Sequence, residues 1–275
     1  PFPFPAPITI DFNVWPHGDQ TSYLVSALVN PLELYRYKWN NGSADSKLIV
    51  DSVGTYCLTV FRDWTQDSTT ACLTFTSNAD LEIQALDEGI PIQGMPIVLY
   101  RFLNPGFQVI DSLISDDKGR ANFKGITRGV YYAQAIPSPA TPLAKQYLPT
   151  YARSASLWQD ANPFQLRGIR PENSPPEAQQ ILLQRTQMLM GEGSISGIVR
   201  GGEGFVPGNT QGFNAQNAGL ANVGIVLYDA NGKIVAVTYT DENGFYLFPA
   251  VPLGAYTVMV NLLGVPPISQ PLIVA

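Results

Sequence analysis

The chain has 275 residues, of which 45% are hydrophobic and 14% are charged, and its formal net charge is −6 at pH 7. Ordinary soluble domains carry about 25% charged residues, so this low charge, with 24 Gly and 23 Pro, argues against a helical bundle, a coiled coil or a charged disordered chain. The net charge is negative, so the chain lacks the basic character of nucleic-acid-binding proteins and we expect no nucleic-acid partner. No apolar run reaches the length of a transmembrane helix, so we expect no membrane span.

The chain begins with alternating proline, Pro1-Phe2-Pro3-Phe4-Pro5-Ala6-Pro7. Every second residue lacks an N–H group, which excludes a regular strand ladder and favours an extended, polyproline-like segment. Such a segment needs a surface, either on its own chain or on a neighbouring copy reached by strand addition. We therefore predict an arm that assembles copies of this chain, with contacts from Phe2, Phe4, Ile8 and Ile10. The first residue is not Met, so either an export leader has been removed or the sequence is a fragment, and the cysteine pair discussed below favours removal of a leader.

Short alternating segments follow the arm, with turn residues between them and no helical period. They predict an antiparallel β-sandwich over residues 1–79, with strand candidates at 8–14, 22–29, 35–39 and 47–51. Trp39, just before the turn Asn40-Asn41-Gly42, is expected in the core of this sandwich.

The two cysteines lie in segments that alternate like strands, 54–60 around Cys57 and 70–75 around Cys72. A hairpin closed at the polar turn 63–67 places the two sulfur atoms opposite each other. We predict a disulfide rather than two buried free cysteines, and a disulfide implies an oxidising, extracytoplasmic compartment.

These residues carry a resemblance. The run Tyr37-x-Trp39-x-Asn41-Gly42 with the paired cysteine hairpin resembles the Ig/PKD-like modules of large bacterial surface proteins. The hairpin tip departs from those modules, because residues 64–68 replace their usual Gly-Cys turn. The resemblance implies an Ig-like sandwich for the first domain.

An internal repeat occupies the remainder of the chain. In each copy, an Ile-Val-Leu-Tyr strand is followed by an Asp-x-x-Gly turn with a Phe-bearing strand, and then by a Gly-x-Tyr strand start. The aligned blocks are 97–100 with 225–228, 115–123 with 240–248, and 125–131 with 250–256. The pattern resembles the prealbumin-like Cna-B and carboxypeptidase-regulatory modules, which implies two further β-sandwiches that serve as spacers. The acidic turns are expected to be solvated, with a calcium site as the alternative.

The first repeat has an extension with three aromatic residues, Tyr147, Tyr151 and Trp158. It resembles a segment of similar modules in surface proteins of gliding-type bacteria. The three side chains either contact a ligand by stacking on a glycan or pack back onto the sandwich. Between the repeats, Ser174, Pro175 and Glu177 are typical of a helix start, so residues 171–192 form either a short helical linker or the beginning of a strand, with the helix favoured.

The sequence therefore predicts an all-β chain of three tandem sandwiches: 1–79 (Ig/PKD-like), 80–170 and 193–275 (both Cna-B/prealbumin-like), with a linker at 171–192. The single histidine, His17, and the two cysteines are too few for a zinc site of the His/Cys type. A His-based triad could use only His17, whose Pro- and Gly-flanked position disfavours that role. No paired-acid motif stands out either, although a hydrolase using Asp87 and Glu88 is the enzymatic alternative.

We accordingly expect a non-enzymatic protein without catalytic, cofactor or metal residues. Its predicted role is that of an extracellular structural or adhesive protein at the cell surface, either a self-assembling filament subunit or a rigid stalk. The alternative is a glycan- or protein-binding accessory module, for which an exposed aromatic row would be evidence.

Overall fold

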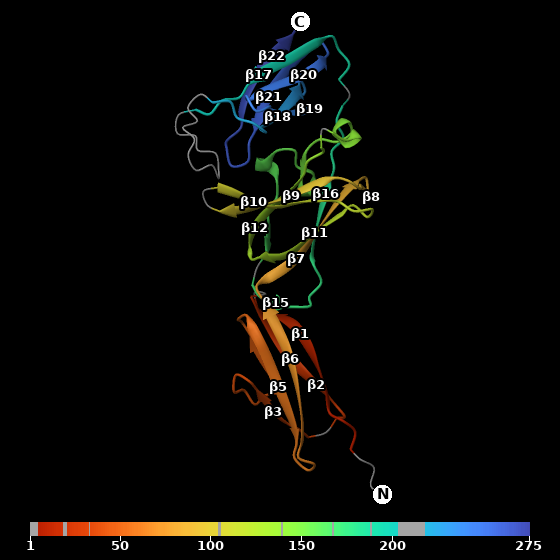
Figure 1. The fold of residues 1–275 in the computed structure, drawn as a ribbon, viewed down its shortest axis with the longest axis vertical. Coiled ribbons are helices and arrows are strands. Elements are labelled where there is room, and N and C mark those ends of the chain that lie inside the picture. Colours follow the sequence, from red (N-terminus) through yellow and green to blue (C-terminus); the bar gives the residue numbers. More distant parts are fainter. Residues whose placement is uncertain are drawn as a thin grey trace. The chain divides into compact units, whose positions relative to one another are not determined.

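The computed structural model describes residues 5–18, 21–32, 34–103, 106–138, 140–166, 168–187, 189–202 and 218–275. Over these residues it consists of β-strands, turns and three short 3-10 helices, which span Pro142–Lys145, Ala152–Ser154 and Trp158–Asp160. The predicted all-β class is confirmed (Figure 1). None of the helices in the described part of the chain has the length and apolar character needed to cross a membrane.

The chain folds into two compact units. Unit 1 comprises residues 1–81, 124–129 and 165–177, and unit 2 comprises 82–123, 130–164 and 178–275. The predicted boundary at 79/80 falls inside a strand, Asn78–Asp87. The division into three sandwiches therefore stays a prediction, which limited proteolysis would test.

Unit 1 contains two antiparallel sheets. The first has the order β1-β2-β4 and the second the order β15-β6-β5-β3. Their bounds are Thr9–His17 (β1), Ser22–Asn30 (β2), Arg36–Trp39 (β3), Lys47–Val50 (β4), Gly54–Arg62 (β5), Asp67–Thr76 (β6) and Arg170–Pro171 (β15). Alternation along the strands sends every second side chain inward. The core consists of Ile8, Val25, Trp39, Leu48, Val50, Leu58, Val60, Phe75 and Ile169. Trp39 is 1% exposed, as predicted.

The first repeat is built on two sheets. One has the order β10-β9-β12-β13, with β14 also paired to β12, and the other has the order β11-β7-β16, with β8 paired to β7. The bounds are Asn78–Asp87 (β7), Ile90–Pro91 (β8), Pro96–Leu103 (β9), Gly106–Ile114 (β10), Arg120–Thr127 (β11), Gly129–Ala135 (β12), Thr150–Tyr151 (β13), Phe164–Leu166 (β14) and Glu177–Leu182 (β16).

The second repeat follows the same plan. Its larger sheet has the order β19-β18-β21-β22 and its smaller sheet pairs β17 with β20. The bounds are Gly193–Ile198 (β17), Gly224–Asp229 (β18), Ile234–Tyr239 (β19), Phe245–Val251 (β20), Gly254–Asn261 (β21) and Ile268–Val274 (β22). The strand order β19-β18-β21 corresponds to β10-β9-β12 in the first repeat. The pairing of β17 with β20 likewise corresponds to the pairing of β7 with β11. The repeat read from the sequence is thus a structural repeat.

The Asp-x-x-Gly turns close identically in both repeats. Asp116 Oδ1 accepts hydrogen bonds from the backbone N–H groups of Lys118 and Arg120, at 2.9 and 2.8 Å, and Gly119 has a φ of 71°. Asp241 makes the same two contacts in the other repeat, and Gly244 has a φ of 79°. The glycine supplies the positive φ and the aspartate satisfies the turn amides, which is the reason for this spacing.

The expected helix in the linker 171–192 is wrong. Residues 177–182 form β16, which pairs with β7. Ile181 is fully buried and Leu183 is 8% exposed. This i, i+2 burial is the period of a strand. Packing of these two side chains outweighs the helix-start signals at Ser174 and Glu177, because local propensity is a weak prior against burial.

Candidate functional site

The predicted disulfide is present. Cys57 and Cys72 face each other directly in the β5–β6 pairing and are joined covalently, with 4.0 Å between their Cα atoms. On either side of the bridge, threonine hydroxyls hydrogen-bond across the strands, Thr55 to Thr74 at 3.1 Å and Thr59 to Thr70 at 2.8 Å. Both strands of the hairpin are thereby held in register along an uncharged face.

The predicted assembly arm is corrected in part. Ile8 is 7% exposed within the core of unit 1, and Ile10 packs against the same core. Ile8 directly precedes β1 and Ile10 lies in it, and both side chains pack on their own sandwich, so they do not form an arm available to a neighbour. Phe2 and Phe4 lie outside the described residues.

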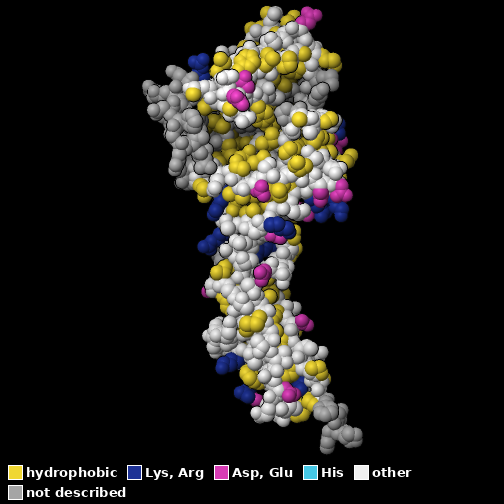
Figure 2. Space-filling model, viewed as in Figure 1, with side chains coloured by type: hydrophobic (Ala, Val, Ile, Leu, Met, Phe, Trp, Pro, Cys, Tyr) yellow, Lys and Arg dark blue, Asp and Glu magenta, His cyan; other side chains and the backbone are white. Residues whose placement is uncertain are grey.

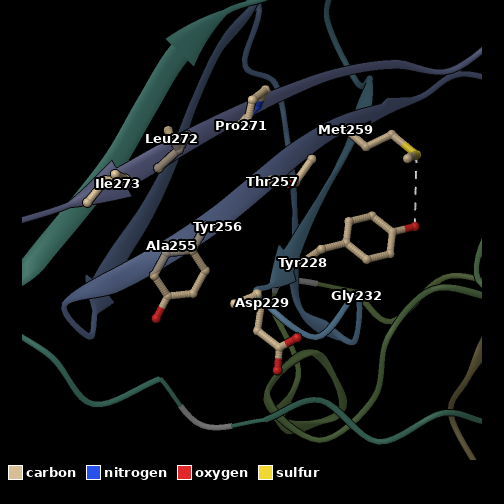
Figure 3. A pocket seen from close by; sticks show the side chains of 11 residues that line it. Tyr228, Asp229, Gly232, Ala255, Tyr256, Thr257, Met259, Pro271, Leu272 and Ile273 are labelled. Carbon is tan, nitrogen blue, oxygen red and sulfur yellow. Dashed lines mark hydrogen bonds between the residues drawn. The ribbon is translucent and has the colours of Figure 1, made fainter.

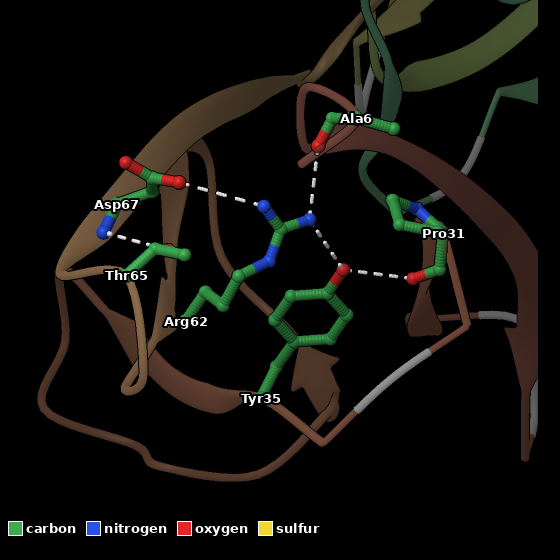
Figure 4. A network of polar contacts seen from close by, with 6 residues as sticks. All are labelled: Ala6, Pro31, Tyr35, Arg62, Thr65 and Asp67. Atoms are coloured by element: carbon green, nitrogen blue, oxygen red, sulfur yellow. Dashed lines mark hydrogen bonds and ion pairs between the residues drawn. The ribbon is translucent and has the colours of Figure 1, made fainter. Parts of the chain in front are cut away.

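A buried arginine ties the start of the described chain to unit 1 (Figure 4). Arg62 is 1% exposed and donates from Nη2 to the carbonyl oxygen of Ala6 at 3.0 Å and to the Tyr35 hydroxyl at 3.4 Å. Its Nη1 lies 3.4 Å from Asp67, and the Tyr35 hydroxyl donates to the carbonyl oxygen of Pro31 at 2.8 Å. One side chain therefore joins residue 6, the segment 31–35 and the β5–β6 turn.

Three exposed apolar side chains belong to the segments that this arginine contacts or to the adjoining turn. Leu32 and Leu34, in the segment that Arg62 holds, are 96% and 95% exposed. Trp64 is 67% exposed, and its ring centroid lies 5.6 Å from the Arg62 guanidinium carbon. We call Leu32, Leu34 and Trp64 the apolar end of unit 1. Large apolar residues with this much exposure are candidates for an interaction surface.

The aromatic residues of the extension do not form an exposed row. Tyr147 and Tyr151 are 7% and 3% exposed, so these two side chains pack back onto the sandwich. They do not offer the predicted exposed surface on which a glycan could stack. The Tyr147 hydroxyl donates to Asp87 Oδ2 at 2.8 Å, and Arg185 lies 2.9 Å from the same oxygen. Hydrogen bonding from Arg185, and less so from Tyr147, lowers the pKa of Asp87 against the opposing effect of burial. The Asp87 carboxylate is thus held in a hydrogen-bonded ion pair with Arg185, to which Tyr147 adds a hydrogen bond.

Trp158 joins the two repeats of unit 2. Its Nε1–H donates to the carbonyl oxygen of Val265 at 3.1 Å, and its ring makes an edge contact with Phe107, at 5.8 Å between centroids. The neighbouring Gln159 side chain donates to the same carbonyl at 3.3 Å. Asn261 donates from Nδ2 to the carbonyl oxygen of Ser156 at 3.0 Å. We call these contacts the junction. Sequence separations above 100 residues explain why no local signal revealed it.

A groove lies on the outer face of β18, β21 and β22 in the second repeat (Figure 3). It encloses about 840 Å³ and includes Tyr228, Met259, Pro271 and Ile273. Ile273 is 78% exposed on β22, the edge strand of the sheet. The Tyr228 hydroxyl lies 3.9 Å from the Met259 sulfur. The lining is mostly apolar, with Asp229 and Thr257 among its polar residues, and we call it the β22 groove.

Figure 2 shows a surface on which charged side chains are sparse and hydrophobic ones are frequent. Within the described ranges, no group of three or more His, Cys, Asp or Glu side chains is placed to hold a metal ion. The oxygen atoms of Asp116 and Asp241 instead cap their own turns.

Residues 205–266 match the sequence model of the SdrD B-like domain family. This match lies within the second repeat, leaves out β17 and β22, and agrees with the Cna-B-like pattern of that region. Among curated proteins, no relative of the chain is found.

Solved structures with partial likeness include the TIE protein of Bacillus anthracis, at 16% identity, a TM-score of 0.29 and 97% coverage of this chain. The chain spans 55% of that protein. GBS52, the minor pilin of Streptococcus agalactiae, matches 72% of this chain and 90% of its own at 15% identity and a TM-score of 0.23. An (S)-allantoin synthase matches 41% of this chain and 46% of its own, at 20% identity and a TM-score of 0.24. At these scores the likenesses carry no conclusion about function.

Proposed function

We propose that the chain is a non-enzymatic structural subunit of the bacterial cell surface, exported from the cytoplasm, that associates with copies of itself into a filament. The observation that carries this proposal is the coexistence of two unlike apolar surfaces, the apolar end on unit 1 and the β22 groove on unit 2. The SdrD B-like match and the disulfide support an extracytoplasmic surface protein.

The two surfaces are suited to each other in chemistry. Leu32, Leu34 and Trp64 protrude and are apolar, while the groove is concave and lined by Tyr228, Met259 and Ile273. A contact between two different surfaces of one chain is heterologous, and such a contact propagates into a filament when its rotation does not close a ring. The end of one copy is therefore proposed to occupy the groove of the next.

Light scattering on mixed variants tests this arrangement. A Leu32→Ser/Leu34→Ser chain lacks the end, and an Ile273→Asp chain lacks the groove. Each alone is expected to stay monomeric, whereas their equimolar mixture should form dimers, because one intact end and one intact groove remain. Leu253→Ser, at a site that is 69% exposed and outside both surfaces, should assemble like the parent chain. Assembly of both single variants at the parent level would refute the arrangement.

The Phe2 and Phe4 arm stays a prediction of the sequence. Removal of residues 1–4, which keeps the Ala6 carbonyl that Arg62 binds, and measurement of the same light-scattering profile would separate its contribution from that of the apolar end.

A further inference from the structure

A partly enclosed cavity of about 190 Å³ lies between the two repeats of unit 2, next to the junction. Hydrogen-bonding side chains from both repeats line it, together with apolar groups such as Val226 and Leu262. The polar residues are Tyr100, Gln134, Tyr151, Ser156, Asn222, Tyr239 and Asn261. We propose that this cavity is a binding site for one neutral sugar residue.

Three phenol groups carry the argument. The Tyr100 hydroxyl donates to Gln134 Oε1 at 3.4 Å, which is a long hydrogen bond. Within the described part of the chain no hydrogen bond is found for the Tyr151 or Tyr239 hydroxyl, and both oxygens are open to the cavity, since neither is among the sealed polar atoms without a partner. Polar groups that face an internal cavity are nearly always hydrogen-bonded, either to the protein or to an occupant of the cavity. We therefore infer that the occupant of the cavity forms hydrogen bonds with these two hydroxyls.

These tyrosines are protonated at physiological pH, and burial moves their titration further away from it. Burial raises the pKa of Tyr100 to about 12 and also raises the pKa values of Tyr151 and Tyr239, with smaller contributions from the neighbouring phenols. All three are thus neutral at physiological pH and can donate a proton to an acceptor oxygen.

The lining defines the charge of the occupant. No Asp, Glu, Lys, Arg or His is among the described residues that form the cavity. A charged ligand buried there without a partner would meet a large desolvation cost, so the occupant is neutral. Phenol rings and aliphatic groups match the C–H faces of a sugar ring, while hydroxyls and amides match its hydroxyl groups.

The size restricts the occupant to a single ring. The volume of about 190 Å³ is below the roughly 300–1,000 Å³ of sites for drug-sized ligands. At about 30 Å³ for each water molecule, it corresponds to about six waters. A cluster of water molecules is accordingly the competing occupant.

Calorimetric titration of the intact chain distinguishes the two. Glucose, galactose, mannose and N-acetylglucosamine are the neutral probes, and glucuronic acid is the charged comparison. At least one neutral sugar is expected to bind saturably, with at least tenfold lower affinity in Tyr151→Phe and Tyr239→Phe, which remove only a hydroxyl. Tyr256→Phe, a core-packed tyrosine outside the cavity, should bind like the parent.

Two results would overturn the proposal. Absence of saturable binding for every neutral sugar, with the chain folded by circular dichroism, would mean that the cavity holds water only. Binding that is equally strong in Tyr151→Phe and Tyr239→Phe would place the sugar elsewhere. Neither result bears on assembly through the apolar end, which is measured separately by light scattering.

Discussion

Ala250 adopts the same left-handed backbone conformation as Gly125, its counterpart in the first repeat, with φ values of 56° and 62°. Both residues lie near the end of the strand that follows the Asp-x-x-Gly turn, β20 and β11 respectively. A left-handed conformation costs a residue with a Cβ atom about 1–2 kcal/mol, and glycine avoids this cost. The second repeat therefore keeps a turn geometry for which its own residue is poorly suited.

Replacing Ala250 by Gly is expected to stabilise the second repeat by about 1 kcal/mol, since relief of the steric cost exceeds the added chain entropy. Gly125→Ala should destabilise the first repeat by a similar amount, and open space around that position leaves backbone strain as the cause. Chemical denaturation measures both free energies of unfolding. Ala255→Gly, in β21 without a positive φ, is the control and should destabilise; a destabilised Ala250→Gly chain would contradict the prediction.

The disulfide should contribute to the stability of unit 1 alone. Its loop spans 15 residues, which corresponds to about 3 kcal/mol in the chain-entropy account. Cys57→Ser/Cys72→Ser, or reduction by dithiothreitol, is expected to lower the melting temperature of unit 1 and leave that of unit 2 unchanged. Differential scanning calorimetry resolves the two. Equal loss in both units, or no loss in unit 1, would be inconsistent with this account.

Asp87 should make unit 2 sensitive to acid. Its pKa is lowered in the folded state, chiefly by hydrogen bonding from Arg185. A lowered folded-state pKa means that the stabilisation is complete above the unfolded-state pKa and disappears as the pH falls through the folded-state value. Denaturation between pH 7 and pH 2 should show this decline in the parent chain and a shallower one in Asp87→Asn. Asp51→Asn, at an exposed position, should leave the profile unchanged; an identical slope in Asp87→Asn would exclude this role.

Trp158 should couple the two repeats. Trp158→Phe retains a ring beside Phe107 but removes the hydrogen bond to the Val265 carbonyl, a loss of about 1 kcal/mol. We expect the single unfolding transition of unit 2 to broaden or split in this variant, as followed by calorimetry. A variant whose transition is as sharp as that of the parent chain would show that the junction is held by other contacts.

The strands, the repeat and the disulfide could be predicted because their signals are local. Alternation of apolar residues indicated β5, β6 and β9, and the Asp-x-x-Gly spacing indicated the turns at Asp116 and Asp241. β16 was missed because the helix-start residues Ser174 and Glu177 were given more weight than the alternation of Ile181 and Leu183, whose burial against β7 depends on distant chain.

The candidate sites were less accessible to sequence reasoning. Tyr151 was recognised as a candidate ligand contact, but its burial beside Tyr100 and Tyr239 depends on pairing within two separate sheets. Ile8 was assigned to an arm, although its place in the alternation of the first strand also suits the core in which it lies. Leu32 and Leu34 gave no signal, since exposed leucines are ordinary in a sequence and only the structure shows that both are almost fully exposed in the segment bonded to Arg62 through Tyr35.

Negative-stain electron microscopy tests the central claim most directly. Purified chain at increasing concentration should form regular filaments, and the Leu32→Ser/Leu34→Ser chain, folded to the same extent by circular dichroism, should not. Monodisperse single particles in the parent sample at every concentration would contradict assembly through these two surfaces.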